Sequence, residues 1–196
     1  MAKIKVARNT TRNAVICKTA AGLFRRKGFR AASMRELAEQ LGVEAPSLYN
    51  HIGSKSELLQ NICFNIADDF TRHIETVEVS LQPAAKKIEQ LIRFHIKLML
   101  RSFDEVYVSN HEWKHLEEPY LANFLNQRKA YESKMVQIIK DGINNKEFKK
   151  MHPQVTVLTI LSAVRGLEFW QKYKEQVNTK ALENNIVQHL LNGITK

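Results

Sequence analysis

One short stretch matches the zinc-hydrolase pattern H-E-x-x-H, namely His111-Glu112-Trp113-Lys114-His115. On a helix the two histidines lie one turn apart on one face and could bind zinc, with the glutamate as general base. Such short matches also arise by chance, and no third ligand follows at the spacing of known zinc proteases. We therefore interpret the stretch as one face of an ordinary amphipathic helix. A zinc-dependent hydrolase is the alternative function, and a regulatory metal held by the two histidines is a second alternative.

A second set of polar side chains is suited to double-stranded DNA rather than to a reaction. Ser and Tyr hydroxyls can bond phosphates, Asn can pair with adenine through two hydrogen bonds, and Arg or Lys can contact a base edge or a phosphate. The candidate DNA-contacting residues are Arg12, Arg35, Ser47, Tyr49, Asn50, His51 and Lys55. For Tyr49 and His51 the alternative is a structural role, packing for the tyrosine and capping for the histidine.

Most of these candidates lie on two short helices predicted within residues 33–55. Ser33 and Glu36 have the spacing of a capping box, which starts the first helix. Gly42 permits the left-handed conformation that ends it, and Pro46 suits the first turn of the next helix. Two short helices joined by a glycine-containing turn form a helix-turn-helix, whose second helix reads the major groove.

The charge of the chain agrees with this interpretation. Its 196 residues carry a net charge of +10, and the isoelectric point is about 9.6. Residues 1–60 hold 11 Lys and Arg against 4 Asp and Glu, a net charge of +7. Most of the excess therefore lies beside the predicted helix-turn-helix, where phosphate contacts need it. The composition favours a polyanionic partner such as DNA.

The cysteines and the hydropathy pattern limit where the protein acts. Cys17 and Cys63 lie far apart without metal-ligand spacing, so we predict reduced, buried thiols. The basic start of the chain is not followed by the apolar region of a signal peptide. No apolar run approaches the length needed to span a bilayer. We expect a cytoplasmic protein with no membrane partner, no metal and no cofactor.

The rest of the chain has helical hydrophobic spacing and few breaks, so we predict an all-α fold of about nine helices. Besides the two short helices, we expect helices over residues 11–27, 55–79, 83–103, 105–116, 119–145, 153–173 and 180–193. Ser54 and Glu57 are predicted to start the second of these, and Thr179 to cap the last. The final two helices are apolar on broad faces, which suggests burial against the chain's own core and against a second subunit.

Residues 16–59 resemble the DNA-binding domain of TetR-family transcriptional regulators. The most specific part is the run Leu48-Tyr49-x-His51, with Lys55 four residues after the histidine. Ile52 departs from the family, which usually has Phe there, and this is an exchange within the core. The other matching residues are Ile16, Ala20, Leu23, Phe24, Gly28, Ser33, Arg35, Leu37, Ala38, Gly42, Val43, Ser47, Ser54, Leu58 and Leu59.

The resemblance implies a homodimer of nine-helix subunits, held together by the last two helices and bound to a palindromic DNA operator. It also implies a ligand cavity among the middle helices, whose occupancy changes the separation of the two recognition helices. We accordingly predict a helix-turn-helix DNA-binding domain over residues 1–54 and a ligand-binding and dimerisation domain over residues 55–196. The expected function is transcriptional repression relieved by a small ligand, with no enzymatic activity. Activation remains open, as does a ligand-binding protein that has lost DNA binding.

The candidate ligand-lining side chains are aromatic or polarizable and lie mostly on the predicted middle helices. They are Phe64, Phe94, His95, Met99, Trp113, Phe124, Arg128 and Tyr131. Helical spacing alone also predicts core burial for most of them, so plain core packing is the alternative. Residues around Glu112, Arg128 and Phe148 are similar to C-terminal domains of TetR-family regulators of lipid and acyl-CoA metabolism. That similarity implies a small hydrophobic effector such as a fatty acid or acyl-CoA. A drug, another hydrophobic metabolite or no effector are the alternatives.

Overall fold

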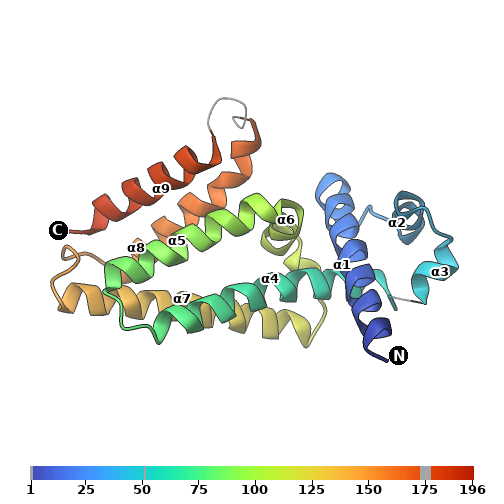
Figure 1. Cartoon of the computed structure of the whole chain (residues 1–196), viewed down its shortest axis with the longest axis horizontal. Helices are drawn as coiled ribbons and strands as arrows, with labels where there is room; N and C mark the ends of the chain where they lie inside the picture. Colours follow the sequence, from blue (N-terminus) through green and yellow to red (C-terminus); the bar gives the residue numbers. More distant parts are fainter. Residues whose placement is uncertain (1, 51, 173–177) are drawn as a thin grey trace. The chain divides into compact units, whose positions relative to one another are not determined.

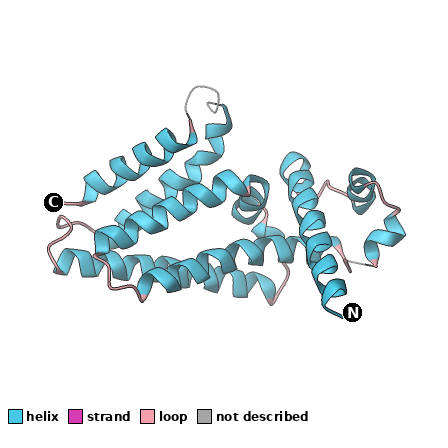
Figure 2. Cartoon of the chain, viewed as in Figure 1, coloured by secondary structure: helices cyan, strands magenta, loops and turns pink. Residues whose placement is uncertain are grey.

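The chain is almost entirely helical. The computed structural model describes residues 2–50, 52–172 and 178–196, with side chains at 12–50, 52–170 and 178–196. Within these residues it forms nine α-helices, two 3-10 helices and no β-strand (Figure 2). No helix among them combines the length and apolar character that crossing a bilayer requires. The predicted all-α fold is confirmed.

The elements follow one another along the chain as shown in Figure 1. They are α1 (Ala2–Lys27), α2 (Met34–Leu41), α3 (Ala45–Tyr49), α4 (Lys55–Glu78), α5 (Ala84–Arg101), α6 (Phe103–His111), η1 (Trp113–His115), α7 (Tyr120–Asn144), α8 (Pro153–Arg165), η2 (Gly166–Lys172) and α9 (Thr179–Ile194).

Most predicted helix boundaries agree with the structure to within two residues, but three differ more. The first helix begins at Ala2, nine residues earlier than predicted. The helix predicted over 105–116 ends at His111 and is followed by a 3-10 turn. The helix predicted over 153–173 changes to 3-10 geometry at Gly166, a residue type that weakens an α-helix.

The helix-turn-helix is capped as its sequence predicts. Ser33 Oγ accepts a hydrogen bond from the Glu36 amide at 3.2 Å, and the Glu36 carboxylate accepts one from the Ser33 amide at 3.0 Å. Gly42 ends α2 with a φ of 65°, a conformation that a side chain would strain. Pro46 lies in the first turn of α3. These local signals fix both ends of the turn between α2 and α3.

Two other caps differ in detail from the prediction. Ser54 Oγ accepts from the Glu57 amide at 3.0 Å, but the Glu57 carboxylate bonds the amide of Gly53, at 2.7 Å. At α9 the cap is Asn178, whose side chain accepts an amide hydrogen bond at 2.7 Å, and Thr179 is the first helical residue. Both helices therefore start within one residue of the predicted position by slightly different bonds.

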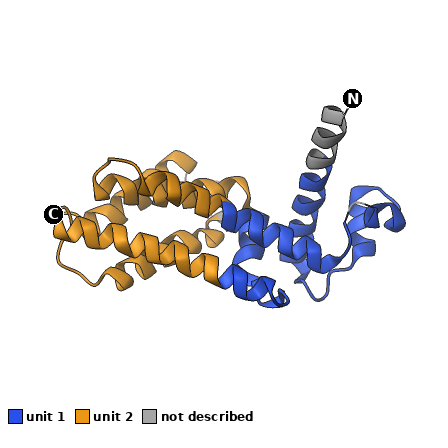
Figure 3. Cartoon of the chain, turned by 90° about the horizontal axis from the view of Figure 1, so that it is seen from below, with its two compact units in different colours: residues 1–68, 104–125 blue, residues 69–103, 126–196 orange. Residues whose placement is uncertain are grey.

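The chain divides into two compact units (Figure 3). Unit 1 comprises residues 1–68 and 104–125, and unit 2 comprises residues 69–103 and 126–196. The helix-turn-helix therefore shares a unit with most of α6, with η1 and with the start of α7. This division reflects which residues pack together. The predicted boundary between a DNA-binding domain and a ligand-binding domain, at residues 54 and 55, stays a prediction.

Unit 1 has one apolar core that holds the two short helices in place. Its residues come from α1, α2, α3 and α4 and also from the segment 104–125. The fully buried members include Leu23, Phe24, Leu37, Leu48, Leu58, Leu59, Val108 and Phe124. Truncating any one of the larger side chains to alanine would cost about 2–5 kcal/mol. The core thus joins the two short helices α2 and α3 to a segment far away in the sequence.

Unit 2 is centred on α5, which packs against both α8 and α9. The side chains of Ile88, Leu91, Ile92 and Ile96 are fully buried. Their spacing places them on one face of the helix, and this face drives the packing.

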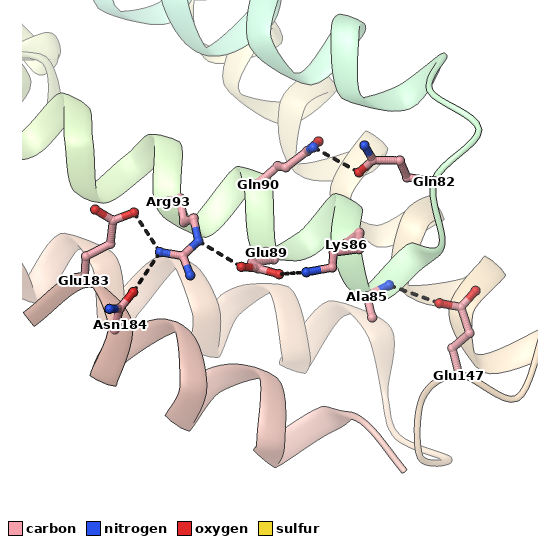
Figure 4. A network of polar contacts seen from close by, with 9 residues as sticks. All are labelled: Gln82, Ala85, Lys86, Glu89, Gln90, Arg93, Glu147, Glu183 and Asn184. Atoms are coloured by element: carbon pink, nitrogen blue, oxygen red, sulfur yellow. Dashed lines mark hydrogen bonds and ion pairs between the residues drawn. The ribbon is translucent and has the colours of Figure 1, made fainter. Parts of the chain in front are cut away.

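A network of polar side chains along α5 forms hydrogen bonds with α9 (Figure 4). Arg93 Nη1 donates to the side chains of Glu183 at 2.8 Å and Asn184 at 3.2 Å, both on α9. Arg93 Nε donates to Glu89 at 2.9 Å, and Glu89 also accepts from Lys86 at 2.8 Å. The bonds from Lys86 and Arg93 lower the pKa of Glu89, so its carboxylate stays charged.

Candidate nucleic-acid interface and effector residues

The short helix α3 presents polar side chains around one buried anchor. Leu48 is 1% exposed, whereas Tyr49 is 50% exposed. Asn50 is exposed and Ser47 is half-buried. One leucine therefore holds the helix against the core while hydroxyl and amide groups remain accessible to a DNA groove. The remaining candidate on this stretch, His51, lies outside the described residues.

Both arginines that were predicted to contact DNA lie in unit 1 and are exposed. Arg35 lies in the first turn of α2, and Arg12 lies on α1. Arg12 lines a small pocket of about 230 Å³ together with Leu41 and Leu48, so it lies beside both short helices. The structure thus brings Arg12 next to the helix-turn-helix. Contact of either arginine with DNA stays a prediction.

Lys55 has a structural role that its sequence position did not indicate. Its ammonium group donates to the backbone oxygens of Phe29 at 2.9 Å, Arg30 at 3.2 Å and Ala32 at 2.9 Å. It also lies 4.6 Å from the centroid of the Phe29 ring, a cation–π distance. Because an ammonium group has three protons, the predicted phosphate contact would have to replace one of these bonds.

The H-E-x-x-H stretch does not form the zinc-binding face of a helix. The α-helix ends at His111, and the following residues form a 3-10 turn, so the prediction of one continuous helix face is wrong. The ring of His111 lies 4.3 Å from that of Tyr107, and the ring of His115 stacks on Phe29 at 5.5 Å. No group of three or more His, Cys, Asp or Glu side chains suited to a metal ion occurs among the described residues.

The Glu112 carboxylate, which would be the general base of a zinc enzyme, instead binds the backbone of its own unit. Its Oε2 accepts a hydrogen bond from the Phe29 amide at 3.1 Å and lies 3.5 Å from His115 Nε2. Burial lowers the pKa of His115, although the Glu112 charge opposes that shift. The lowered pKa favours the neutral ring, which stacks on Phe29, and the stretch thus contacts the chain just after α1.

The eight predicted ligand-lining residues are divided between the two units. Unit 1 holds Phe64, Trp113 and Phe124. The Phe64 and Phe124 rings meet edge-on at 5.9 Å, and Trp113 packs against the same core. Unit 2 holds Phe94, His95, Met99, Arg128 and Tyr131. A ligand-lining role stays a prediction for every one of them.

Within unit 2, the part-buried His95 and the buried Tyr131 form a polar pair. His95 Nε2 lies 2.9 Å from the Tyr131 hydroxyl oxygen. Burial lowers the pKa of His95 to about 3, and electrostatic interactions with Arg165 and His73 add to the shift. Burial also raises the pKa of Tyr131. Both groups are thus neutral at physiological pH, which suits them to anchor one polar group of an otherwise apolar ligand.

Two residues of α4 that the predicted ligand set omitted complete this cluster. The Phe70 ring lies 4.3 Å from His95 and 5.6 Å from Tyr131, and the His73 ring stacks on Phe94 at 3.9 Å. Nδ1 of His73 is buried and has no hydrogen-bond partner among the described residues. The three-residue spacing of Phe70 and His73 places them on one helix face, which is a signal in the sequence. The sequence gives no signal that these two residues contact His95 and Phe94 of α5.

Two family models match the chain in succession. The model of bacterial regulatory proteins of the tetR family matches residues 16–62, which include α2, α3 and the start of α4. The model of the tetracyclin repressor-like C-terminal domain matches residues 81–194, more than half of the chain.

Curated relatives and solved structures extend the similarity over nearly the whole chain. The HTH-type transcriptional repressor KstR2 of Mycobacterium tuberculosis is 22% identical over 192 residues, which cover 95% of this chain and 94% of the relative. KstR2 of Rhodococcus jostii is 33% identical over 98 residues, covering 50% and 48%. The structure of the ketosteroid transcriptional regulator KstR2 of Mycobacterium tuberculosis has a TM-score of 0.87 at 19% identity, covering 94% and 95%. AibR in complex with isovaleryl coenzyme A and operator DNA has a TM-score of 0.80 at 23% identity, covering 92% and 98%. These two structures share the fold of this chain.

Proposed function

This chain belongs to the TetR family of bacterial regulatory proteins, and we propose that it represses transcription as a homodimer on a palindromic DNA operator. We further propose that a small hydrophobic ligand releases it from DNA, and that it acts in the cytoplasm, where the operator lies. As a member of this family the protein is a transcriptional regulator and not an enzyme.

The observation that carries the proposal is the helix-turn-helix itself, built as its capping signals require and matched by the family model. Its exposed Arg35, Tyr49 and Asn50 offer a charge, a hydroxyl and an amide, which are the groups used for phosphates and base edges. The curated relatives named above are repressors, which favours repression over activation.

A dimer is supported by the apolar surface of the last two α-helices. On α8, Val155 is 56% exposed and Leu158 is 61% exposed. On α9, Leu182, Ile186 and Leu190 are only half-buried. Exposed apolar residues on neighbouring helices favour self-association, and a two-fold dimer is the commonest way to bury them.

A fatty acid or acyl-CoA is the effector class that we propose. AibR, which shares the fold, was solved with isovaleryl coenzyme A. In this chain the pair His95–Tyr131, with Phe70 and Phe94 around it, would supply a polar anchor within apolar surroundings. We expect the acyl group to lie against these rings.

The proposal is tested by selecting duplexes from a random DNA library with the purified protein. We expect a palindromic site, bound about tenfold more weakly by Arg35→Ala and by Tyr49→Phe, because each loses a contact of about 1–3 kcal/mol. Circular dichroism and the oligomeric state should match the unaltered chain. A panel of fatty acids and acyl-CoAs is then added to the complex, and at least one should release the DNA. Selection of no sequence at low salt would refute the DNA-binding function, and release by no acyl compound would refute the effector class.

A further inference from the structure

Phe29, which lies two residues after the end of α1, makes contacts with three residues of unit 1. Its amide donates to Glu112 Oε2 at 3.1 Å, and its carbonyl oxygen accepts from Lys55 Nζ at 2.9 Å. The ring stacks on His115 at a centroid distance of 5.5 Å and an interplanar angle of 21°. The residue is 8% exposed. Both backbone groups and the ring of Phe29 are thus fixed by residues distant in the sequence.

The hydrogen bonds of Lys55 connect the segment before α2 to the segment after α3. Lys55, the first residue of α4, also donates to the carbonyl oxygens of Arg30 and Ala32. Residues 30–54, which contain α2 and α3, therefore begin and end at the same cluster of hydrogen bonds. A displacement of Phe29 would move the point from which α2 and then α3 extend.

Two of the three residues that hold Phe29 belong in sequence to the C-terminal part of the protein. Glu112 and His115 lie within residues 81–194, the span of the C-terminal family model, yet they pack in unit 1. Asp104, in the same segment, forms an ion pair with Arg25 of α1 at 2.5 Å. The segment 104–116 is therefore a portion of the C-terminal sequence that is built into the DNA-binding unit.

We propose that Glu112 and His115 are positioning residues for DNA binding, which act through Phe29 to keep the helix-turn-helix in its DNA-competent position. This inference rests on the proposed function. It assigns a role to the two residues that a zinc enzyme would have used as base and ligand. Glu112 supplies a hydrogen-bond acceptor for one backbone amide, and His115 supplies a flat surface for one ring.

The test compares four variants on the duplex selected by the unaltered protein. Glu112→Ala removes the acceptor and should weaken binding about tenfold, because a charged hydrogen bond to a part-buried amide is lost. Glu112→Gln keeps an oxygen that can accept the bond and should stay within about threefold of the unaltered chain. His115→Ala should weaken binding by about threefold, whereas His115→Phe, which keeps the stacked ring, should not.

Glu117→Ala is the matched control, because Glu117 is an exposed carboxylate five residues further along and its loss changes the net charge equally. Removal of a negative charge by itself strengthens DNA binding or leaves it unchanged, so weaker binding by Glu112→Ala has the opposite sign to the charge effect. Amide hydrogen exchange gives a second readout. Residues 29–50 should exchange faster in Glu112→Ala than in Glu117→Ala, while α5 and α9 stay unchanged.

Equal DNA affinity and equal exchange in Glu112→Ala and Glu117→Ala would overturn the inference. Weak binding that Glu112→Gln fails to restore would also overturn it, because the amide bond would then not be the route. If Glu112→Ala does not fold, the comparison of His115→Ala with His115→Phe decides in the same way. Failure of the unaltered chain to select any duplex refutes the proposed function itself, and this result is distinct from equal binding by the variants.

Discussion

The part-buried His95 makes the stability of unit 2 depend on pH in a defined direction. Burial holds the pKa of its imidazole at about 3 in the folded chain, against 6.5 for an ordinary histidine. A folded pKa below the unfolded one means that the unfolded chain binds the proton first. The free energy of unfolding therefore contains the full contribution of neutral His95 above about pH 6.5. This contribution declines as the pH falls toward 3.

The expected magnitude follows from the two pKa values. Each unit of pKa difference is worth about 1.4 kcal/mol, so acidification from pH 7 to pH 4 should cost about 3 kcal/mol through this one group. Burial also lowers the pKa of His73, which adds to the loss of stability in acid. Replacing His95 by Gln removes one titrating group while keeping a terminal amide that can bond the Tyr131 hydroxyl.

The assay is urea unfolding at half-unit steps between pH 4 and pH 7, followed by circular dichroism. His95→Gln should reduce the slope of unfolding free energy against pH by up to about 1.4 kcal/mol per pH unit between pH 4 and 6. The exposed His189 of α9 provides the control, as His189→Gln. If the slope for His95→Gln equals that of the unaltered chain, His95 is not buried and neutral, and the reasoning is refuted.

Three further predictions concern packing, thiol chemistry and assembly. A Cβ at Gly142 would lie 2.4 Å from the buried Phe148 ring, so Gly142→Ala should cost about 1–3 kcal/mol in urea unfolding. Gly193→Ala, which meets nothing within 4 Å, should cost nothing. Burial raises the pKa of the Cys17 thiol from 9.0 to about 11. Its thiolate fraction, and hence alkylation by iodoacetamide at pH 7.5, should be about a hundredfold lower than for an unshifted thiol, and rapid labelling of the folded chain would contradict this. Leu158→Glu should convert the proposed dimer to a monomer in light scattering without loss of helix, and a persistent dimer would exclude α8 from the interface.

Features decided within one turn of helix could be predicted from the sequence. The Ser33–Glu36 capping box and the Gly42 terminus involve residues at most four positions apart, so their types and spacing suffice. The hydrophobic spacing likewise predicted the helices. For the same reason the errors at Ser54 and Asn178 amount to a shift of one residue.

Features that depend on contacts between distant residues could not be predicted. Lys55 was expected at a phosphate, but its partners lie 23 to 26 positions earlier in the chain. The role of Glu112 depends on Phe29, 83 positions away. Sequence could not predict how the ligand set is divided between the two units, because helical spacing identifies a buried face without stating which helix covers it. The spacing of Phe70 and His73 was visible, but their partners on α5 were not.

The discontinuity of unit 1 has a consequence for the order in which the protein can mature during synthesis. Val108, Leu116 and Phe124 fill the core on which α1 and α4 also pack. A ribosome that has released only residues 1–68 has therefore delivered a helix-turn-helix with part of its core still missing. We expect such a nascent chain, or a recombinant fragment with the same end, to expose Phe24 and Phe29 and to require a chaperone. The core of unit 1 is therefore complete only after residue 125 has been translated, when residues 69–103 of unit 2 have already been made.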